Sequence, residues 1–466
     1  MSYANARRRS GAARSLTEGS PFRLILSFAA PLLLGFLFQQ FYSFVDTAIV
    51  GKYLGAEKLA AVGDTGSVNF LVLGFCQGFC SGFSIPIAQA FGAKDEQSLR
   101  QHVAMSVYLC AVLGVVMALV TALACPWMLR LMDTPEEILP SSVSYIRIVF
   151  AGIPAIILYN MAGGILRSLG DSKTPVYFLI LASLINVVLD LLLIIFVHLD
   201  VAGAAIATVI SQLISGIGCV IVMIRRFPVL HLSKDDWHFR PQLAKSLCSV
   251  GLPMGLQFSI TAIGSVMVQW SVNALGVAAV AAVAAGGKIS MFFCCVFDTL
   301  ATTMATFAGQ NMGARKIDRI HQGLRDAAII GIIYCLIAMA VIFLFGPAML
   351  SLFVDRTANP DVMDMGYTFL KVNSAFYIPL LFVNILRLSI QGMGYTRLAM
   401  LAGVFEMVAR TAVAVLLVPV LGFLGATLAN PAAWVMADLF LFPCYTHVIH
   451  VVRQRFHEPR TWAAET

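Results

Sequence analysis

The sequence predicts an all-α polytopic membrane protein whose twelve transmembrane helices form two lobes of six. Three observations carry this prediction: the composition, the number of apolar segments, and an internal repeat. Of the 466 residues, 59% are hydrophobic and 12% are charged, and the mean hydropathy is +0.86. Soluble domains carry about 25% charged residues, so this chain cannot cover a globular surface with polar groups.

The apolar segments are long enough to span a bilayer, which takes about 20 helical residues. The twelve predicted helices cover residues 24–50, 60–88, 103–125, 143–165, 176–197, 202–224, 250–275, 281–308, 327–353, 369–391, 398–418 and 424–446. This pattern divides the chain into an N-terminal tail (1–23), an N-lobe (24–224), a polar linker (225–249), a C-lobe (250–446) and a C-terminal tail (447–466).

The basic residues predict the orientation of these helices. If the N-terminus is cytoplasmic, 22 of the 31 lysines and arginines fall in the tails and loops on the cytoplasmic side. Six fall in the opposite loops or at the outer ends of predicted helices, and three (Lys288, Arg387 and Arg410) fall deep within predicted helices. Cytoplasmic loops are enriched in Lys and Arg, so we expect an inner-membrane protein with both termini in the cytoplasm.

The two halves of the chain repeat one another at an offset of 221 to 225 residues. The clearest copies are Gln89-Ala-Phe-Gly92-Ala93-Lys94 and Gln310-Asn-Met-Gly313-Ala314-Arg315. Other matched positions are Gly55 and Gly276, Pro154 and Pro379, Asn160 and Asn384, and Gly170 and Gly394. Six helices is an even number, so both halves enter the membrane in the same direction. The sequence therefore predicts a pseudo-two-fold axis along the membrane normal, and kinks at Pro154 and Pro379.

One carboxylate interrupts the first apolar segment, Leu24–Gly51. Asp46 lies between Val45 and Thr47, near the outer end of the predicted helix. A charged residue inside the membrane costs about 2.5–3.5 kcal/mol on insertion scales, so it marks a functional site by default. The alternative is an interfacial aspartate that reaches water one turn away.

Further polar residues fall at a similar predicted depth. Asn186 and Asp190 are four residues apart on one helix face, and Thr208 lies in the next helix. Together with Asp46 they supply oxygen ligands suited to a proton or a hard cation such as Na⁺. The alternative is a hydrogen-bonded cluster that only packs helices, worth about 0.6–2 kcal/mol.

Three features of the sequence resemble those of a known family. The run PLLLGFLFQQFYSFVDTAIVGKYLGAEKLAAVG, the repeated QxxGA(K/R) motif and the Asn186-xxx-Asp190 helix are similar to the multidrug and toxic compound extrusion (MATE) family of DinF- and NorM-like bacterial transporters. The resemblance extends from Pro21 to about Arg455. It implies two lobes that alternate access and export amphipathic, often cationic, compounds against inward H⁺ or Na⁺ flow. It also implies that Asp46, Asn186, Asp190 and Thr208 form the cation site, as in DinF-like and archaeal members.

The C-lobe departs from some members of that family. Its first helix, Pro253–Ala274, lacks the carboxylate of some sodium-coupled NorM-type proteins. Instead, Asp298, Arg387, Glu406, Arg410 and Asp438 lie in later helices. Glu406 and Arg410 are four residues apart, so an intrahelical ion pair is an alternative to a role in transport. Candidate residues of the substrate cleft are Gln40, Asn160, Gln257, Asp298, Asn384, Arg387, Glu406 and Arg410.

Other classes of function fit less well. A flippase for a lipid-linked or oligosaccharide substrate is the main alternative, but it predicts a strongly basic cleft, and only three bases fall deep within predicted helices. HExxH, GxSxG and P-loop motifs are absent from the sequence, which argues against an enzyme. The ten scattered cysteines indicate packing rather than disulfides or metal sites. We expect no cofactor beyond the coupling ion, no cleaved leader, no nucleic-acid partner and a monomer.

Overall fold

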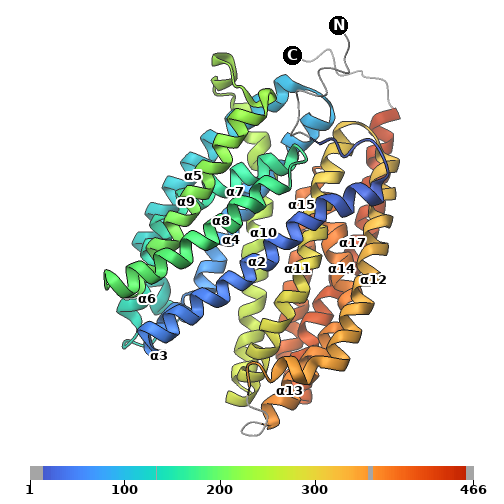
Figure 1. Cartoon of the computed structure of the whole chain (residues 1–466). Helices are drawn as coiled ribbons and strands as arrows, with labels where there is room; N and C mark the ends of the chain where they lie inside the picture. The colour runs from blue at the N-terminus through green and yellow to red at the C-terminus, as the bar shows by residue number, and fades with distance from the viewer. Residues whose placement is uncertain (1–13, 133, 355–359, 458–466) are drawn as a thin grey trace. The chain divides into compact units, whose positions relative to one another are not determined.

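The computed structural model describes residues 14–132, 134–354 and 360–457, and these residues form helices and no β-strand (Figure 1). The helices of the first half are α2 (Pro21–Leu54), α3 (Ala56–Asp64), α4 (Gly66–Gly92), α5 (Glu96–Leu131), α6 (Leu139–Ala151), α7 (Ile153–Ser168), α8 (Lys173–Leu191), the π-helix η1 (Leu192–Phe196) and α9 (Asp200–Arg226). Two 3₁₀ turns follow, η2 (Pro228–Leu230) and η3 (Lys234–Trp237). The second half contains α10 (Pro241–Asn273), α11 (Val277–Gly313), α12 (Ile317–Leu350), α13 (Pro360–Ala375), α14 (Tyr377–Gly392), α15 (Thr396–Ala412), the π-helix η4 (Val413–Leu417), α16 (Val418–Leu421) and α17 (Phe423–His457).

The number of membrane-spanning helices agrees with the sequence prediction. Within the described ranges, ten helices are long and apolar enough to cross a membrane, and two bent pairs bring the number to twelve. The pairs are α6 with α7, bent by 46°, and α13 with α14, bent by 51°. Pro154 and Pro379 lie in the first turns of α7 and α14. The predicted kinks are therefore confirmed, because a proline cannot donate the backbone hydrogen bond that would continue the preceding helix.

Helices extend past the apolar segments on both sides of the predicted linker and at the C-terminal end. Within the polar linker predicted for 225–249, α9 continues to Arg226 and α10 begins at Pro241. Pro228 ends the first helix and Pro241 occupies the first position of the second, where a missing N–H costs nothing. The predicted C-terminal tail is helical as far as His457. Hydropathy finds the apolar part of a helix and misses its polar extension into water. Tail residues 1–13 and 458–466, and Arg356, lie outside the described residues.

The internal repeat appears in the local backbone. Gly55 and Gly276 precede equivalent helices with φ of +88° and +98°. Lys94 and Arg315, the last residues of the repeated motif, both adopt left-handed conformations with φ of 59° and 57°. The π-helices η1 and η4 also begin 221 residues apart, at Leu192 and Val413. The two halves therefore adopt the same irregular backbone conformations at matched positions.

Contacts divide the chain into two compact units whose boundaries differ from the predicted lobes. The first unit includes the start of α10 up to Ala262, and the second includes 16–26, 92–94 and everything from Ile263. A row of glycines explains why the start of α10 packs with the first unit. A Cβ on Gly78 of α4 would lie 2.5 Å from the Met254 carbonyl oxygen of α10, and one on Gly82 would lie 2.5 Å from the Gly251 Cα. Glycines at four-residue intervals let helix backbones pack this closely in membranes.

The second unit binds the backbone of residues 16–19 through the repeated motif. Gln310 Oε1 accepts a hydrogen bond from the Leu16 N–H at 2.7 Å, and Asn311 Nδ2 donates to the Leu16 carbonyl at 3.3 Å. Arg319 donates to the Gly19 carbonyl at 2.9 Å. The Leu16 side chain is fully buried. The motif predicted from sequence only as a repeat thus anchors the segment that precedes α2.

Candidate cation site of the N-terminal unit

Three helices bring the predicted cation-site residues together. Asp46 comes from α2, Asn186 and Asp190 from α8, and Thr208 from α9, and α8 packs along α9 (Figure 1). With its amide nitrogen oriented as a donor, Asn186 Nδ2 lies 2.9 Å from Asp190 Oδ2, and its oxygen accepts the Thr208 backbone N–H at 3.1 Å. The carboxyl groups of Asp46 and Asp190 lie close enough for a hydrogen bond between them. The structure therefore joins all four residues in one network.

The network is buried on its α8 side and half-buried at Asp46 and Thr208, and it carries unused acceptor capacity. Asp190 is 0% exposed and Asn186 is 1% exposed. Oδ1 of Asp46 and Oδ1 of Asp190 are buried and accept no hydrogen bond from an N–H or O–H of the described residues. An ionised carboxylate has no proton to donate, so a hydrogen bond between two carboxyl groups requires a proton on one of them. The arrangement thus suits a bound proton or a cation that takes its place.

Two tyrosines that were not among the predicted site residues lie near this network. The Tyr42 hydroxyl is hydrogen-bonded to the Thr208 side chain. Tyr145 on α6 is close enough to interact electrostatically with Asp46 and Asp190. Tyr42 precedes Asp46 by four residues on α2, and this helical spacing was a usable signal. No sequence spacing connects α6 with α2 or α8, so Tyr145 needed the structure.

The C-terminal unit contains a different kind of buried polar cluster. Arg387 of α14 forms an ion pair with Glu406 of α15, and Arg410 Nη2 lies 3.6 Å from the second Glu406 oxygen. Arg410 Nε also donates to Asn430 Oδ1 at 3.2 Å, and Asp438 of α17 interacts electrostatically with Arg387. The intrahelical pair of Glu406 with Arg410 is present, but it belongs to a larger network with two arginines and two acids.

The other candidate cleft residues are placed singly within their own units. Asn160 and Asn384, which are matched in the repeat, each donate to the backbone carbonyl four residues earlier at 2.9 Å. Gln257 is buried and Gln40 is half-buried. Asp298 is exposed, and among the described ion pairs Arg387 binds Glu406 rather than Asp298. A shared substrate cleft remains a prediction for these residues.

The fold and the buried ionisable residues define a class of protein. A helical membrane protein made of two sequence repeats, with ionisable side chains buried inside its helices, has the architecture of a secondary transporter. The sequence profile of the MatE family matches residues 31–192 and 253–416, which is more than half of the chain. The chain therefore belongs to the MatE family of MATE transporters, and the resemblance seen in its sequence is confirmed.

Known relatives cover most of the chain. It is 31% identical over 347 residues to the probable multidrug resistance protein YoeA of Bacillus subtilis, covering 73% of this chain and 75% of the relative. It is 28% identical to YpnP of the same organism, covering 80% and 82%. A FAD transporter of Shewanella oneidensis is 24% identical, with 77% and 79% covered. The crystal structure of a MATE protein in complex with MaL6 superposes with a TM-score of 0.88 at 24% identity, covering 94% and 98%.

Proposed function

We propose that the protein is a multidrug efflux transporter that exchanges amphipathic, often cationic, organic compounds for H⁺ or Na⁺. The proposal that it exports drugs is supported by relatives named as multidrug resistance proteins. Another relative is named as a FAD transporter, which is consistent with a protein that performs no catalysis. The choice of coupling ion is our own inference, and the contact between Asp46 and Asp190 is the observation that carries it.

The coupling mechanism follows from the chemistry of that pair. A proton shared by Asp46 and Asp190 neutralises one of two adjacent charges inside the membrane. Na⁺ could replace the proton by binding the carboxylate oxygens together with the Asn186 and Thr208 oxygens, which are ligands a hard cation prefers. Loading from outside then stabilises the state that has released its cargo. An inward-negative potential supplies about 2.3 kcal/mol per charge per 100 mV.

Orientation, location and assembly belong to the same proposal. The excess of Lys and Arg in the predicted cytoplasmic segments supports a cell-membrane protein with both termini inside. We propose that it works as a monomer, because each chain carries both repeats of a two-lobed transporter.

Transport by purified protein in liposomes tests the proposal. Efflux of a fluorescent organic cation would be measured under an H⁺ gradient and, separately, an Na⁺ gradient, and FAD would serve as an anionic second cargo. Asp46→Asn and Asp190→Asn keep the shape of each side chain and remove its charge. Asp318→Asn is the matched control, because Asp318 is an exposed carboxylate paired with Arg453 on the surface.

We expect the control to transport like the parent, and the two site variants to fall to the rate of empty liposomes under the coupling gradient. Retention of full transport by both site variants under both gradients would refute the coupling site. Selective transport of FAD with no export of cations would refute the proposed cargo class and leave the site intact.

A further inference from the structure

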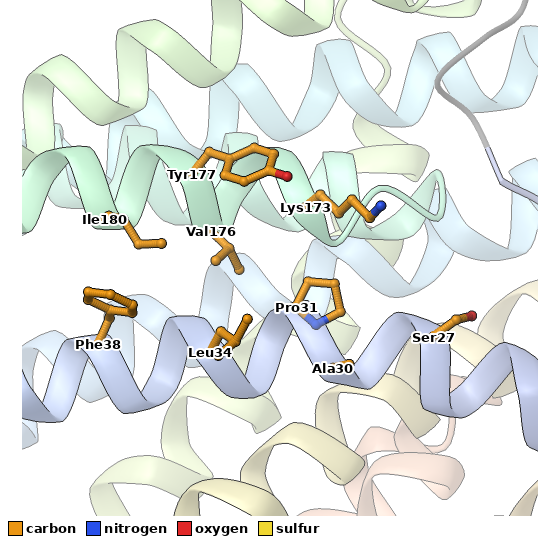
Figure 2. A pocket seen from close by; sticks show the side chains of 9 residues that line it. All are labelled: Ser27, Ala30, Pro31, Leu34, Phe38, Lys173, Val176, Tyr177 and Ile180. Atoms are coloured by element: carbon orange, nitrogen blue, oxygen red, sulfur yellow. The ribbon is translucent and has the colours of Figure 1, made fainter.

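A lateral groove lies between α2 and α8 in the N-terminal unit, away from the cation site. Its cavity is about 370 Å³, within the range of small-molecule pockets. Leu34 and Phe38 of α2 face Val176 and Ile180 of α8 across it (Figure 2). Each pair is four residues apart and so lies on one helix face. The groove therefore runs along both helices rather than into the core.

The groove is apolar along its length and charged at one end. Figure 2 places Lys173 toward one end of the groove, and Phe38 and Ile180 toward the other. Lys173 is the first residue of α8, so its ammonium group lies where the apolar helix begins. An occupant that matches this groove has an apolar chain and an anionic group at one end.

Nothing among the described ion pairs neutralises Lys173. The nearest acid in sequence, Asp171, caps α8 instead: its Oδ1 accepts the backbone N–H groups of Lys173 and Thr174, each at 3.0 Å. Its Oδ2 accepts the Thr174 hydroxyl at 2.6 Å. The Lys173 ammonium thus remains available to an external anion, and its charge disfavours a cationic cargo in the groove.

The groove opens sideways. Leu34 is 56% exposed and Tyr177 is 66% exposed, although both line the cavity and lie on helices long enough to span a membrane. An apolar opening on two helices of spanning length is accessible to an acyl chain, and Lys173 at the start of α8 lies where a headgroup would be. A lysine near a membrane surface attracts anionic lipid by about 1 kcal/mol.

From this geometry we infer that the groove binds one anionic phospholipid, with an acyl chain along α2 and α8 and its phosphate at Lys173. The same two helices carry Asp46 and Asp190. They approach closely beside the groove, where a Cβ on Gly35 would lie 2.9 Å from Val176 Cγ2. A lipid held here contacts both helices that supply the coupling carboxylates. Lipid binding itself does not depend on the proposed transport function.

Photocross-linking in nanodiscs tests this inference. Benzoylphenylalanine would replace Tyr177 in the groove or Leu184, an exposed residue of α8 outside it. The bilayer would contain equal amounts of phosphatidylglycerol and phosphatidylcholine, and mass spectrometry would count the cross-linked lipids by headgroup. We expect about fivefold enrichment of phosphatidylglycerol at position 177, because the attraction of about 1 kcal/mol from one lysine corresponds to that ratio. We expect no enrichment at position 184.

Variants of Lys173 make the test specific. Lys173→Gln should abolish the enrichment at position 177, and Lys173→Arg should retain it. Equal cross-linking of the two lipids at both positions would overturn the inference, as would enrichment that survives in Lys173→Gln. Displacement of phosphatidylglycerol by a saturating organic cation would assign the groove to cargo instead. Cross-linking at position 184 reports that each variant is folded and inserted.

Discussion

The buried polar clusters of the two repeats occupy equivalent helices and differ in charge balance. In the first repeat, Asn186 and Asp190 lie on α8 just before the π-helix η1. In the second, Glu406 and Arg410 lie on α15 just before the equivalent π-helix η4. π-Helical segments occur frequently at functional sites. The same local backbone, an α-helix that continues into a π-helix, therefore carries two polar clusters that differ in charge.

The difference lies in where the neutralising charge comes from. In the first repeat two carboxyl groups meet, and no basic side chain is paired with them among the described ion pairs. In the second, Glu406 is paired with both Arg387 and Arg410. A cluster with internal counter-ions needs no external ion, whereas an acidic pair does. We therefore expect substitutions in the first cluster to reduce transport and substitutions in the second to reduce the free energy of unfolding.

The largest expected effect is a loss of stability on breaking the second cluster. Glu406→Gln leaves two arginines buried without their shared counter-ion, and breaking a buried ion pair costs about 3–5 kcal/mol. Thermal unfolding in detergent would measure this loss. The double variant Glu406→Gln with Arg387→Met should lose less, because one uncompensated charge is removed. If the double variant were as unstable as the sum of the two single variants, Glu406 and Arg387 would not be coupled.

A substitution in the acidic pair, Asp46 and Asp190, should reduce transport and leave stability nearly unchanged. Asp190→Asn removes one of two adjacent carboxyl groups and keeps a side chain that can bond Asn186. We expect its unfolding free energy to stay within about 1 kcal/mol of the parent or to rise, while gradient-driven transport is lost. Unfolding and transport would be measured on the same preparation. A large loss of stability would show that the pair holds the helices together, as Glu406 does.

A smaller effect is expected at Asn186. Asn186→Ala removes the amide that bonds Asp190 and the Thr208 backbone. Hydrogen bonds between membrane helices are worth about 0.6–1.7 kcal/mol, so the apparent affinity for the coupling ion should fall about three- to twentyfold. The ion concentration that gives half-maximal transport would report this. Asn373→Ala is the matched control, since Asn373 is also buried and its amide donates to the Phe369 carbonyl of its own helix.

The smallest effect is expected outside both clusters, in the segment between α9 and α10. Burial alone would raise the pKa of Asp236, but hydrogen bonds from Ser233 and the charge of Arg100 outweigh it and hold the pKa below its ordinary value. Ionised Asp236 therefore stabilises the folded state. This stabilisation is present above the unfolded pKa of about 3.9 and is lost as the pH falls through the lower folded pKa. Asp236→Asn should cost about 1 kcal/mol at neutral pH and flatten the pH dependence of unfolding below pH 4.

How far the sequence predicted the molecule depended on spacing along the chain. The helices, the repeat and the kinks at Pro154 and Pro379 follow from hydropathy and matched positions. Asn186 and Asp190 were found together because four residues make one helical turn. Their contact with Asp46 rested on an estimate of depth, and Tyr145 had no signal. The pairing of Arg387 with Glu406 joins two helices, and hydropathy contains no information about which helix faces meet.

The central claim is that Asp46 and Asp190 bind the coupling ion, and infrared difference spectroscopy on purified protein tests it most directly. A step from alkaline to acidic pH should produce the carbonyl band of a protonated carboxylic acid, and if Na⁺ competes, added Na⁺ should remove that band. We predict that most of this signal disappears in both Asp46→Asn and Asp190→Asn and persists in Asp318→Asn. An unchanged band in both site variants would contradict the account.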